Sequence, residues 1–309
     1  PAIAVAGLTK RYGSTERGTL ALDGIDFEVQ PGEVFGFLGP NGAGKTTTIR
    51  LLTGLARPTS GQARVLGLDL IRDLARIKKR IGVVPEASNL YDELTAYDNL
   101  VFSMQLYGVP RAERTGRAEA LLARFRLADR RDTPFAQLSR GMKRALTIAA
   151  ALAHHPQLVF MDEPTTGLDV VSARQLRQTI AGLRDEGVTV FLTTHYLEEA
   201  ERLCDRIALL VRGRIVALDT VEGLKARVAG QAAAELLLER AGAAPETRRI
   251  VIDEGDAGLS IERALAQTRA EGLRVLAVNT LTPTLEDVFV TLTGLSADVM
   301  RVDKGGKGR

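Results

Sequence analysis

The sequence predicts an α/β fold with an antiparallel β lead-in, a mostly parallel core sheet, a helical subdomain and a small α+β C-terminal domain. Three observations lead to this prediction. Apolar runs at 34–38, 158–161 and 188–192 are typical of strands buried on both faces of a parallel sheet. Helical patterns separate these runs, as βαβ units require. Beyond residue 220 the composition shifts to Ala, Glu, Arg and Leu, and a second, smaller pattern of strands and helices begins.

Composition narrows the class of protein. The chain has 309 residues, 45% hydrophobic and 26% charged, which is ordinary for a globular protein. Lys and Arg number 41 against 38 Asp and Glu, and the formal charge of +3 is too weak to predict a nucleic-acid partner. No uncharged apolar stretch approaches the ~20 residues that cross a bilayer, and the N-terminus lacks a signal-peptide pattern. These features predict a cytoplasmic protein.

The elements of the first domain, residues 1–220, follow from local patterns. Short β-like pieces at 2–5, 20–22 and 25–29 predict the antiparallel lead-in sheet. From 34 to 84 the pattern predicts a strand, a loop, a helix, a β stretch near 63–66, a basic helix and a strand at 81–84.

A helical subdomain is predicted from about 87 to 153. Thr95-x-x-Asp98 fits a capping box at its first helix. A later apolar face has helical spacing and comprises Ala118, Leu121, Leu122 and Phe125. His154 and His155, beside Pro156, have no partners by spacing and are predicted to be loop residues.

The C-terminal part follows a hairpin predicted at 206–211 and 214–218. Residues 221–297 are predicted to form an accessory domain, and residues 298–309 a flexible tail. The elements expected in the accessory domain are a strand at 249–252, a helix at 260–271, a strand at 273–278 and a helix at 283–292. Pro283 and Gly294 mark the start and stop of the last helix.

A glycine-rich loop carries the first functional signal. The run from Gly39 to Thr47 fills every fixed position of the phosphate-binding pattern G-x-x-x-x-G-K-[ST]. Backbone amides of such a loop point at a polyanion where a helix begins, and the helix dipole adds positive potential. Lys45 is expected to meet the terminal phosphates and Thr46 to offer its hydroxyl to Mg²⁺. The residues predicted to bind ATP here are Gly39, Pro40, Asn41, Gly42, Ala43, Gly44, Lys45, Thr46 and Thr47.

Two carboxylates follow the apolar strand at 158–161. Paired acids are usually solvated, but at the end of a buried strand in a chain with a phosphate loop the catalytic interpretation is favoured. Asp162 is predicted to hold the magnesium shell, and Glu163 to polarise the attacking water.

Further motifs follow in a specific order. Leu138-Ser139-Arg140-Gly141-Met142 opens a helix that runs to about residue 153. Gly167-Leu168-Asp169 comes shortly after the carboxylate pair, and His195 comes directly after the strand that begins at 188. With these motifs, residues 1 to about 220 resemble the nucleotide-binding subunit of an ABC transporter, a P-loop NTPase.

The resemblance implies a role for each motif. Residues 39–47 match the Walker A motif and 158–163 match Walker B, while His195 matches the switch histidine that acts with Glu163 in hydrolysis. The family's other contacts to nucleotide or its magnesium ion map onto Tyr12 as the adenine platform, Glu86 in the Q-loop, Ser139 and Gly141 in the signature and Asp169 in the D-loop. Residues 281–290 resemble part of the C-terminal extension of the daunorubicin-resistance branch of exporter ATPases.

The sequence departs from the family pattern at three positions. Glu86 stands where glutamine is usual; it still offers an oxygen to Mg²⁺ or its water but adds negative charge. In the signature, Arg140 replaces the first glycine and Met142 replaces glutamine. Ser139 and Gly141 preserve the hydroxyl, the close backbone approach and the helix start.

The resemblance implies an ATPase that uses ATP and Mg²⁺ and pairs head to tail with a second ATPase subunit, as a homodimer or pseudo-symmetric dimer. It also implies a separate integral membrane permease, a place on the cytoplasmic face of the membrane, and export of a drug-like or lipid-like substrate. Two alternatives stay open. One is a soluble ABC ATPase that acts on ribosomes or DNA. The other is a binding-only regulator, suggested by Glu86 and Arg140.

Overall fold

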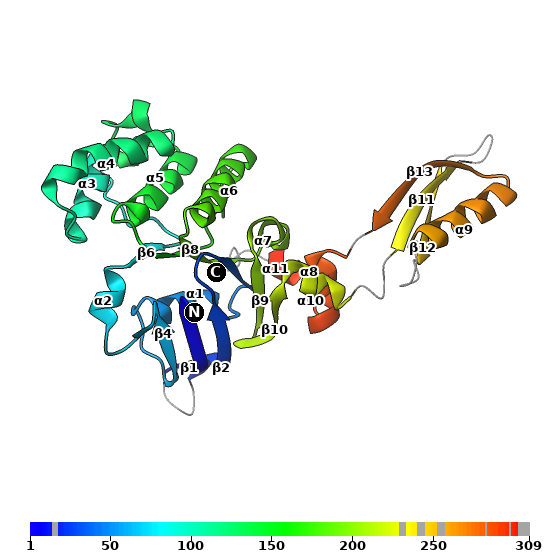
Figure 1. The fold of residues 1–309 in the computed structure, drawn as a ribbon, viewed down its shortest axis with the longest axis horizontal. Coiled ribbons are helices and arrows are strands. Elements are labelled where there is room, and N and C mark those ends of the chain that lie inside the picture. The colour runs from blue at the N-terminus through cyan, green and yellow to red at the C-terminus, as the bar shows by residue number, and fades with distance from the viewer. Residues whose placement is uncertain are drawn as a thin grey trace, which may run out of the picture. The chain divides into compact units, whose positions relative to one another are not determined.

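The structure is a computed structural model that describes residues 1–13, 18–228, 233–239, 245–251, 257–281, 283–296 and 298–301. The chain divides into two compact units (Figure 1). One comprises residues 1–218 and the segment that begins at Asp298, and the other comprises residues 219–297.

The first unit contains an antiparallel sheet with the strand order β2-β1-β4-β5. Its strands are β1 (Ile3–Tyr12), β2 (Thr19–Val29), β4 (Ser60–Val65) and β5 (Leu68–Asp69). Every pairing in it is antiparallel, which confirms the expected lead-in sheet. The β stretch expected near 63–66 is β4, and it pairs with β1 in this sheet.

The core sheet has the order β10-β9-β3-β8-β7-β6. Its strands are β3 (Val34–Leu38), β6 (Ile81–Val84), β7 (Leu158–Asp162), β8 (Thr189–Thr194), β9 (Arg206–Val211) and β10 (Arg214–Thr220). β3 runs parallel to β8 and β9, and β7 runs parallel to β6 and β8. Because carboxyl ends of parallel strands share one edge, the loops after β3, β6, β7 and β8 meet there.

Aromatic packing joins the two sheets. Phe27 of β2 lies 5.8 Å from Phe35 and 5.4 Å from Phe37 of β3, measured between ring centroids. Phe191 of β8 contacts both β3 rings and also Phe160 of β7. Burial of these large rings supplies much of the apolar stabilisation that holds the strands bearing the site.

The first unit also contains helices, which are labelled in Figure 1. They are α1 (Lys45–Leu52), α2 (Leu74–Lys78), α3 (Ala96–Leu106), α4 (Arg111–Arg124), α5 (Arg140–Leu152), α6 (Val170–Asp185), α7 (Leu197–Leu203) and α11 (Asp298–Arg301), with short 3₁₀ turns at Ala128–Arg130 and Phe135–Gln137. The apolar face predicted for α4 is buried. Thr95 caps α3 by accepting from Asp98 N, but the Asp98 carboxylate bonds to the Thr95 hydroxyl, so only half of the capping box forms.

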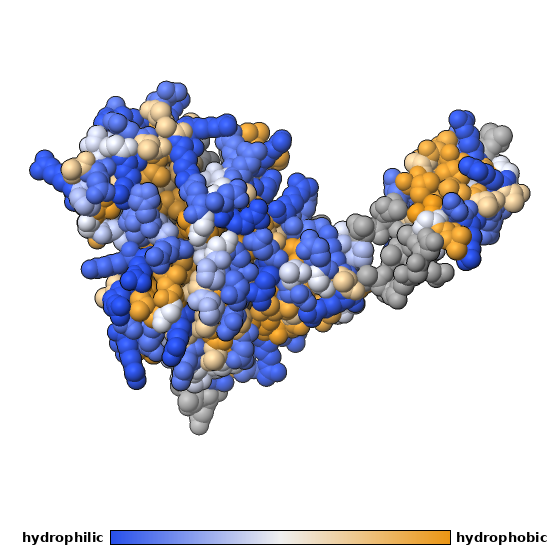
Figure 2. Space-filling view, viewed as in Figure 1, coloured by the Kyte–Doolittle hydropathy of each residue, from blue (hydrophilic) through white to orange (hydrophobic). Residues whose placement is uncertain are grey.

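The second unit holds a three-stranded antiparallel sheet in the order β12-β11-β13. Its elements are α8 (Val221–Ala226), β11 (Ala233–Glu239), β12 (Glu246–Val251), α9 (Ala257–Ala270), β13 (Arg274–Leu281) and α10 (Leu285–Thr293). Leu236, Leu238 and Leu273 form its core, with Leu265 of α9 packed against them. Figure 2 shows a group of apolar residues on the visible face of the part that holds this sheet.

Several expectations for this end of the chain were wrong. The central strand, β11, was not predicted. Its Ala, Glu and Leu residues favour a helix locally, and pairing with two partner strands overrides that preference. The last helix begins at Leu285, later than expected, because Thr284 forms a capping box with Asp287. Its predicted stop at Gly294 is confirmed.

The tail was expected to be flexible from residue 298, but its first four residues form the helix α11. Residues 302–309 lie outside the described residues, and so does Ile252 at the end of the strand predicted at 249–252.

Candidate functional site

The phosphate loop connects β3 to α1. Lys45, the first residue of α1, is only 5% exposed and points back into its own loop. Its Nζ donates to Gly39 O at 2.6 Å and to Pro40 O at 3.3 Å. The same Nζ lies 3.4 Å from Oε1 of Glu163, so the loop lysine and the acid after β7 meet in one place.

Crowding explains two glycines of this loop. A Cβ at Gly39 would lie 2.1 Å from Leu210 O, and one at Gly44 would lie 2.6 Å from Ala21 O. Gly44 also has φ +116°, which L side chains rarely adopt. Backbone oxygens of β9 and β2 therefore leave no room for a side chain at these two positions. Asn41 and Gly42 lie at its tip, Ala43 is buried, Thr46 is exposed and Thr47 is half-buried.

Asp162 ends β7 inside a network of hydroxyls. Its Oδ1 accepts from Thr193 Oγ1 at 2.6 Å, and it also has a hydrogen bond with the Thr46 side chain. Burial raises the pKa of Asp162, and these two hydrogen bonds only partly offset that effect. Thr46 and Asp162, predicted as magnesium ligands, are thus in direct contact.

Glu163 follows with a left-handed backbone, φ +46°, which is unusual for a residue with a side chain. Its amide donates to Thr193 O and Thr193 Oγ1, both at 3.1 Å, and its Oε2 accepts from Thr166 Oγ1 at 3.1 Å. The backbone of β8 therefore holds Glu163 from one side and its own loop from the other. This bend turns the carboxylate toward Lys45.

His195 reaches the same carboxylate. Its Nδ1 lies 3.1 Å from Oε2 of Glu163, and the ring is almost fully buried against Tyr196. Burial by itself would raise the pKa of Glu163, but the contact with His195 and the charge of Lys45 outweigh it and lower this pKa to about 2. Glu163 is therefore ionised at neutral pH, as a base must be.

Glu86 follows β6 at the same edge of the sheet and is exposed. Its charge is near enough to raise the pKa of Asp162 further. Tyr12, at the end of β1, is 38% exposed, and the Lys10 ammonium lies over its ring at 4.7 Å. Tyr12 thus presents an aromatic surface, while Lys10 adds positive charge to it.

The signature and the D-loop contact each other. Ser139 caps α5 by accepting from Met142 N at 3.3 Å, and Asp169 caps α6 by accepting from Ser172 N and Ser172 Oγ. A Cβ at Gly141 would lie 2.4 Å from Ser172 Oγ, so a side chain there would separate the two helices. Asp169 is thus occupied in a helix cap, which lowers its pKa.

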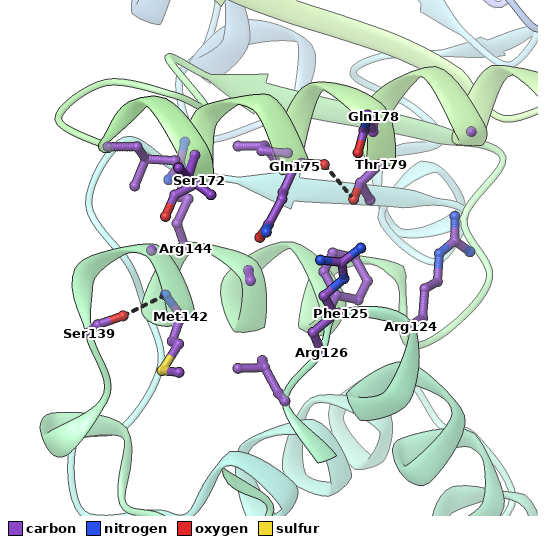
Figure 3. A pocket seen from close by; sticks show the side chains of 17 residues that line it. Arg124, Phe125, Arg126, Ser139, Met142, Arg144, Ser172, Gln175, Gln178 and Thr179 are labelled. Carbon is purple, nitrogen blue, oxygen red and sulfur yellow. Dashed lines mark hydrogen bonds between the residues drawn. The ribbon is translucent and has the colours of Figure 1, made fainter. Parts of the chain in front are cut away.

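A cavity of about 550 Å³ opens beside the signature (Figure 3). Residues of α5 line one wall, and residues of α6 line the opposite wall, where Gln175 reaches inward. Arg124 and Arg126, at the end of α4, lie at another side. No residue of the phosphate loop lines this cavity, and Arg144 of its lining also bonds the backbone of Glu163.

The donor set at Asp162 fits magnesium. No group of three or more His, Cys, Asp or Glu side chains that could hold a metal occurs among the residues that the structure describes. Mg²⁺ does not need one, because it usually takes one or two protein oxygens together with waters and substrate phosphates. The paired Thr46 hydroxyl and Asp162 carboxylate supply such oxygens at the phosphate loop.

Comparison with known proteins identifies the family. A family model described as ABC transporter matches residues 22–166. The chain is 39% identical to the daunorubicin/doxorubicin resistance ATP-binding protein of Streptomyces peucetius, with 96% of this chain and 94% of that protein covered. The chain belongs to the ABC transporter ATP-binding proteins. It is also 41% identical to a fluoroquinolones export ATP-binding protein of Mycobacterium tuberculosis, covering 94% and 93% of the two chains.

Solved structures agree with the family. A dimeric post-hydrolysis state of an ATP-binding cassette bound to ADP and Pi matches with a TM-score of 0.65 and 27% identity, covering 71% of this chain and 98% of that one. The ATP-binding subunit of an ABC transporter matches at 0.66 and 32%, covering 74% and 93%. This ABC protein is therefore a nucleotide-binding ATPase with the ABC cassette fold.

Sequence reasoning missed four residues of this ABC site. Thr193 bonds both Asp162 and the Glu163 amide, and Thr166 bonds the Glu163 carboxylate. Buried Glu199 of α7 accepts from Thr165 at 2.7 Å and from Thr194 at 3.1 Å, linking the loop after Walker B to the strand end that carries His195. Arg144 of α5 bonds the loops after β6 and β7. Arg144 had one sequence signal, because it shares a helical stripe with Ile148 and Ala151. The other three had no signal beyond their polar character.

Proposed function

We propose that this ABC ATPase powers a separate integral membrane permease that exports a drug-like or lipid-like substrate. The observation that carries this proposal is similarity over nearly the whole chain, the second unit included, to proteins named for daunorubicin resistance and fluoroquinolone export. Among the described residues no helix is both long and apolar enough to span a bilayer. A transport role therefore needs a partner that does, with this chain on the cytoplasmic face of the membrane.

In the proposed reaction, the phosphate loop, residues 39–47, holds the ATP phosphates, with Lys45 at the terminal ones. Its present bonds to Gly39 O and Pro40 O are replaceable, because phosphate oxygens are stronger acceptors for an ammonium than carbonyl oxygens are. Tyr12 stacks on adenine, and Glu163 orients and polarises the attacking water. His195, in contact with Glu163, fixes the direction of that carboxylate.

Magnesium would be held by the Thr46 hydroxyl and Asp162, with Glu86 contributing directly or through a water. The ion would supply positive charge beside the phosphates. The hydrogen bond between the Thr46 side chain and Asp162 supports this assignment, because it already brings the two oxygens together.

Two copies of the chain are proposed to pair head to tail. Ser139, Gly141 and the Asp169 region of one copy then face the nucleotide held by Lys45 of the other. The N-terminus of α5 and its serine cap suit contact with a phosphate. Support comes from the similarity to a dimeric cassette bound to ADP and Pi.

Glu163→Gln tests the chemistry. The amide keeps the size of the side chain but removes the base, so turnover should fall by roughly a hundredfold or more while ATP still binds. Glu198→Gln is the matched control, because Glu198 is an exposed acid paired with Arg202 on α7 and should turn over like the wild type.

The partner is tested separately. The tagged wild-type chain should be extracted from native membranes in mild detergent, and the proteins that accompany it identified. A co-purifying polytopic membrane protein supports the transport role. Ribosomal proteins or DNA without such a protein would contradict it. The pairing is tested by gel filtration of Glu163→Gln with ATP, where a monomer at saturating nucleotide would contradict the dimer.

A further inference from the structure

Arg144 lies in the first half of α5, the helix that begins at the signature. It is 9% exposed and shares a stripe with Thr147, Ile148 and Ala151, which are also buried. A charged side chain on such a stripe is costly unless the surrounding protein satisfies its donors. What surrounds Arg144 therefore decides its role.

The guanidinium group is fully satisfied by backbone carbonyls. Nε donates to Pro164 O at 2.7 Å, and Nη2 donates to Asp162 O at 2.9 Å and Glu163 O at 3.1 Å. Nη1 donates to Pro85 O at 2.5 Å and Glu86 O at 3.3 Å. The five N–H groups of an arginine thus meet five carbonyl oxygens.

These carbonyls belong to two loops that are far apart in the sequence. Pro85 and Glu86 follow β6, whereas residues 162–164 end β7 and begin the next loop. Ser139, which caps α5, stands about one turn before Arg144. One side chain therefore ties the signature helix to the loop of Glu86 and to the loop of Asp162 and Glu163.

Arginine suits this place and lysine does not. Burial lowers the pKa of Arg144 to about 10, although the neighbouring charges of Asp162, Glu86 and Glu163 act in the opposite direction. The group is therefore still charged at neutral pH. A lysine offers three donors on a single nitrogen and could not reach both loops with the same bonds.

We propose that Arg144 is a positioning residue, which holds the Glu163 loop and the Glu86 loop in the geometry for hydrolysis and couples both to the signature helix. It touches no reacting atom. Movement of α5 at the signature end is transmitted through its guanidinium to the backbone that aims Glu163. The proposal rests on the ATPase activity and on the role proposed above for Glu163, not on the identity of any permease.

The test compares Arg144→Met and Arg144→Lys with wild type in the full chain, measured alone or with its permease, whichever form turns over. We expect kcat to fall roughly tenfold or more in Arg144→Met, with ATP affinity changed less than about threefold. Arg144→Lys should recover only part of the loss. The fluorescence of a bound ATP analogue gives the affinity independently of turnover.

Lys143→Met is the matched control. Lys143 is the neighbouring cation on α5, and its Nζ lies 5.2 Å from the Phe135 ring centre, away from both loops. It should keep wild-type kcat. Wild-type kcat in a folded Arg144→Met would overturn the proposal, as would equal losses of kcat and affinity, which indicate general loosening.

If Arg144→Met does not fold, Arg144→Lys decides, because it keeps the charge. Wild-type turnover in a folded Arg144→Lys would then overturn the proposal. Failure of the Glu163 assignment is recognised separately, since Glu163→Gln would then remain active while the Arg144 variants could still be slow.

Discussion

Nζ of Lys45 lies 3.4 Å from Oε1 of Glu163, and both side chains are buried. The ion pair joins the phosphate loop after β3 to the acid after β7, two strands that are not neighbours in the sheet because β8 lies between them. A buried pair of this kind is weak evidence for stability, because both charges lose water. Its effect is to fix the position of the base relative to the cation that meets the phosphates.

Lys45→Ala should weaken nucleotide binding. The change removes the cation of the loop and leaves the buried Glu163 carboxylate without its nearest positive charge. We expect affinity for a fluorescent ATP analogue to fall by roughly tenfold or more, as for the loss of a charge-assisted contact. Lys78→Ala, an exposed lysine of α2, is the control. Affinity within threefold of wild type would contradict the assigned role.

The low pKa of Glu163 predicts acid sensitivity. Its pKa falls from the ordinary 4.5 to about 2 on folding, so the stabilisation is present above pH 4.5 and is lost as the pH falls toward 2. The full contribution of the lowered pKa to the unfolding free energy is about 3 kcal/mol, at 1.36 kcal/mol for each pKa unit. Urea unfolding at pH 5 and pH 3 should show about 2 kcal/mol more loss in wild type than in Glu163→Gln. Equal losses would show that Glu163 is not paired in the folded state.

Glu199 should behave in the opposite way. Burial raises its pKa, and the hydrogen bonds from Thr165 and Thr194 offset this only in part. Its ionised form therefore destabilises the fold, and this cost disappears as the pH falls through the raised pKa toward 4.5.

Glu199→Gln should therefore be more stable than wild type, with a larger gain at pH 7 than at pH 4.5. The gain in unfolding free energy should stay within about 1 kcal/mol, and the threonine bonds are kept because the amide oxygen still accepts them. Glu199→Ala, which loses those bonds and leaves a gap, should cost about 2–3 kcal/mol at pH 4.5 and less at pH 7, because it also removes the ionised carboxylate. Chemical denaturation measures all three proteins. A gain that grows in acid would contradict the assignment.

Gly167 provides a test of the contact between signature and D-loop. A Cβ there would lie 2.6 Å from Cζ of Arg140, and the residue has φ +73°. Gly187 has φ +78°, and no atom lies within 4 Å of a Cβ built there. Gly187→Ala therefore measures the free-energy cost of the backbone conformation alone. We expect Gly187→Ala and Gly167→Ala each to cost about 1 kcal/mol of unfolding free energy, because the exposed Arg140 side chain can move away from the new Cβ.

A larger cost in Gly167→Ala that disappears when Arg140→Gly is added would show that the Arg140 side chain is held against the D-loop. Thermal unfolding of the single and double variants measures the coupling between the two positions. If the two effects simply add, Arg140 does not pack on the D-loop, and another reason is needed for arginine in the signature.

The sequence by itself determined the parts of this protein whose signals are local. The phosphate loop has fixed spacing, the buried parallel strands are continuous apolar runs, and Asp162 and Glu163 stand directly after one of them. Local patterns of this kind depend on backbone geometry within a few residues, so they are readable without knowledge of the fold.

Only the tertiary structure decided which distant groups meet. Arg144 is a cation on a mainly apolar helix stripe, and its partners become visible only where β6 and β7 end beside it. The segment of β11 has a helical composition, and it becomes a strand because β12 and β13 pair with it. His154 is a loop residue, as predicted, yet it bonds Ile81 O and stacks on Tyr107. Such roles depend on partners up to 73 residues away, and one chain carries no local signal for partners at that separation.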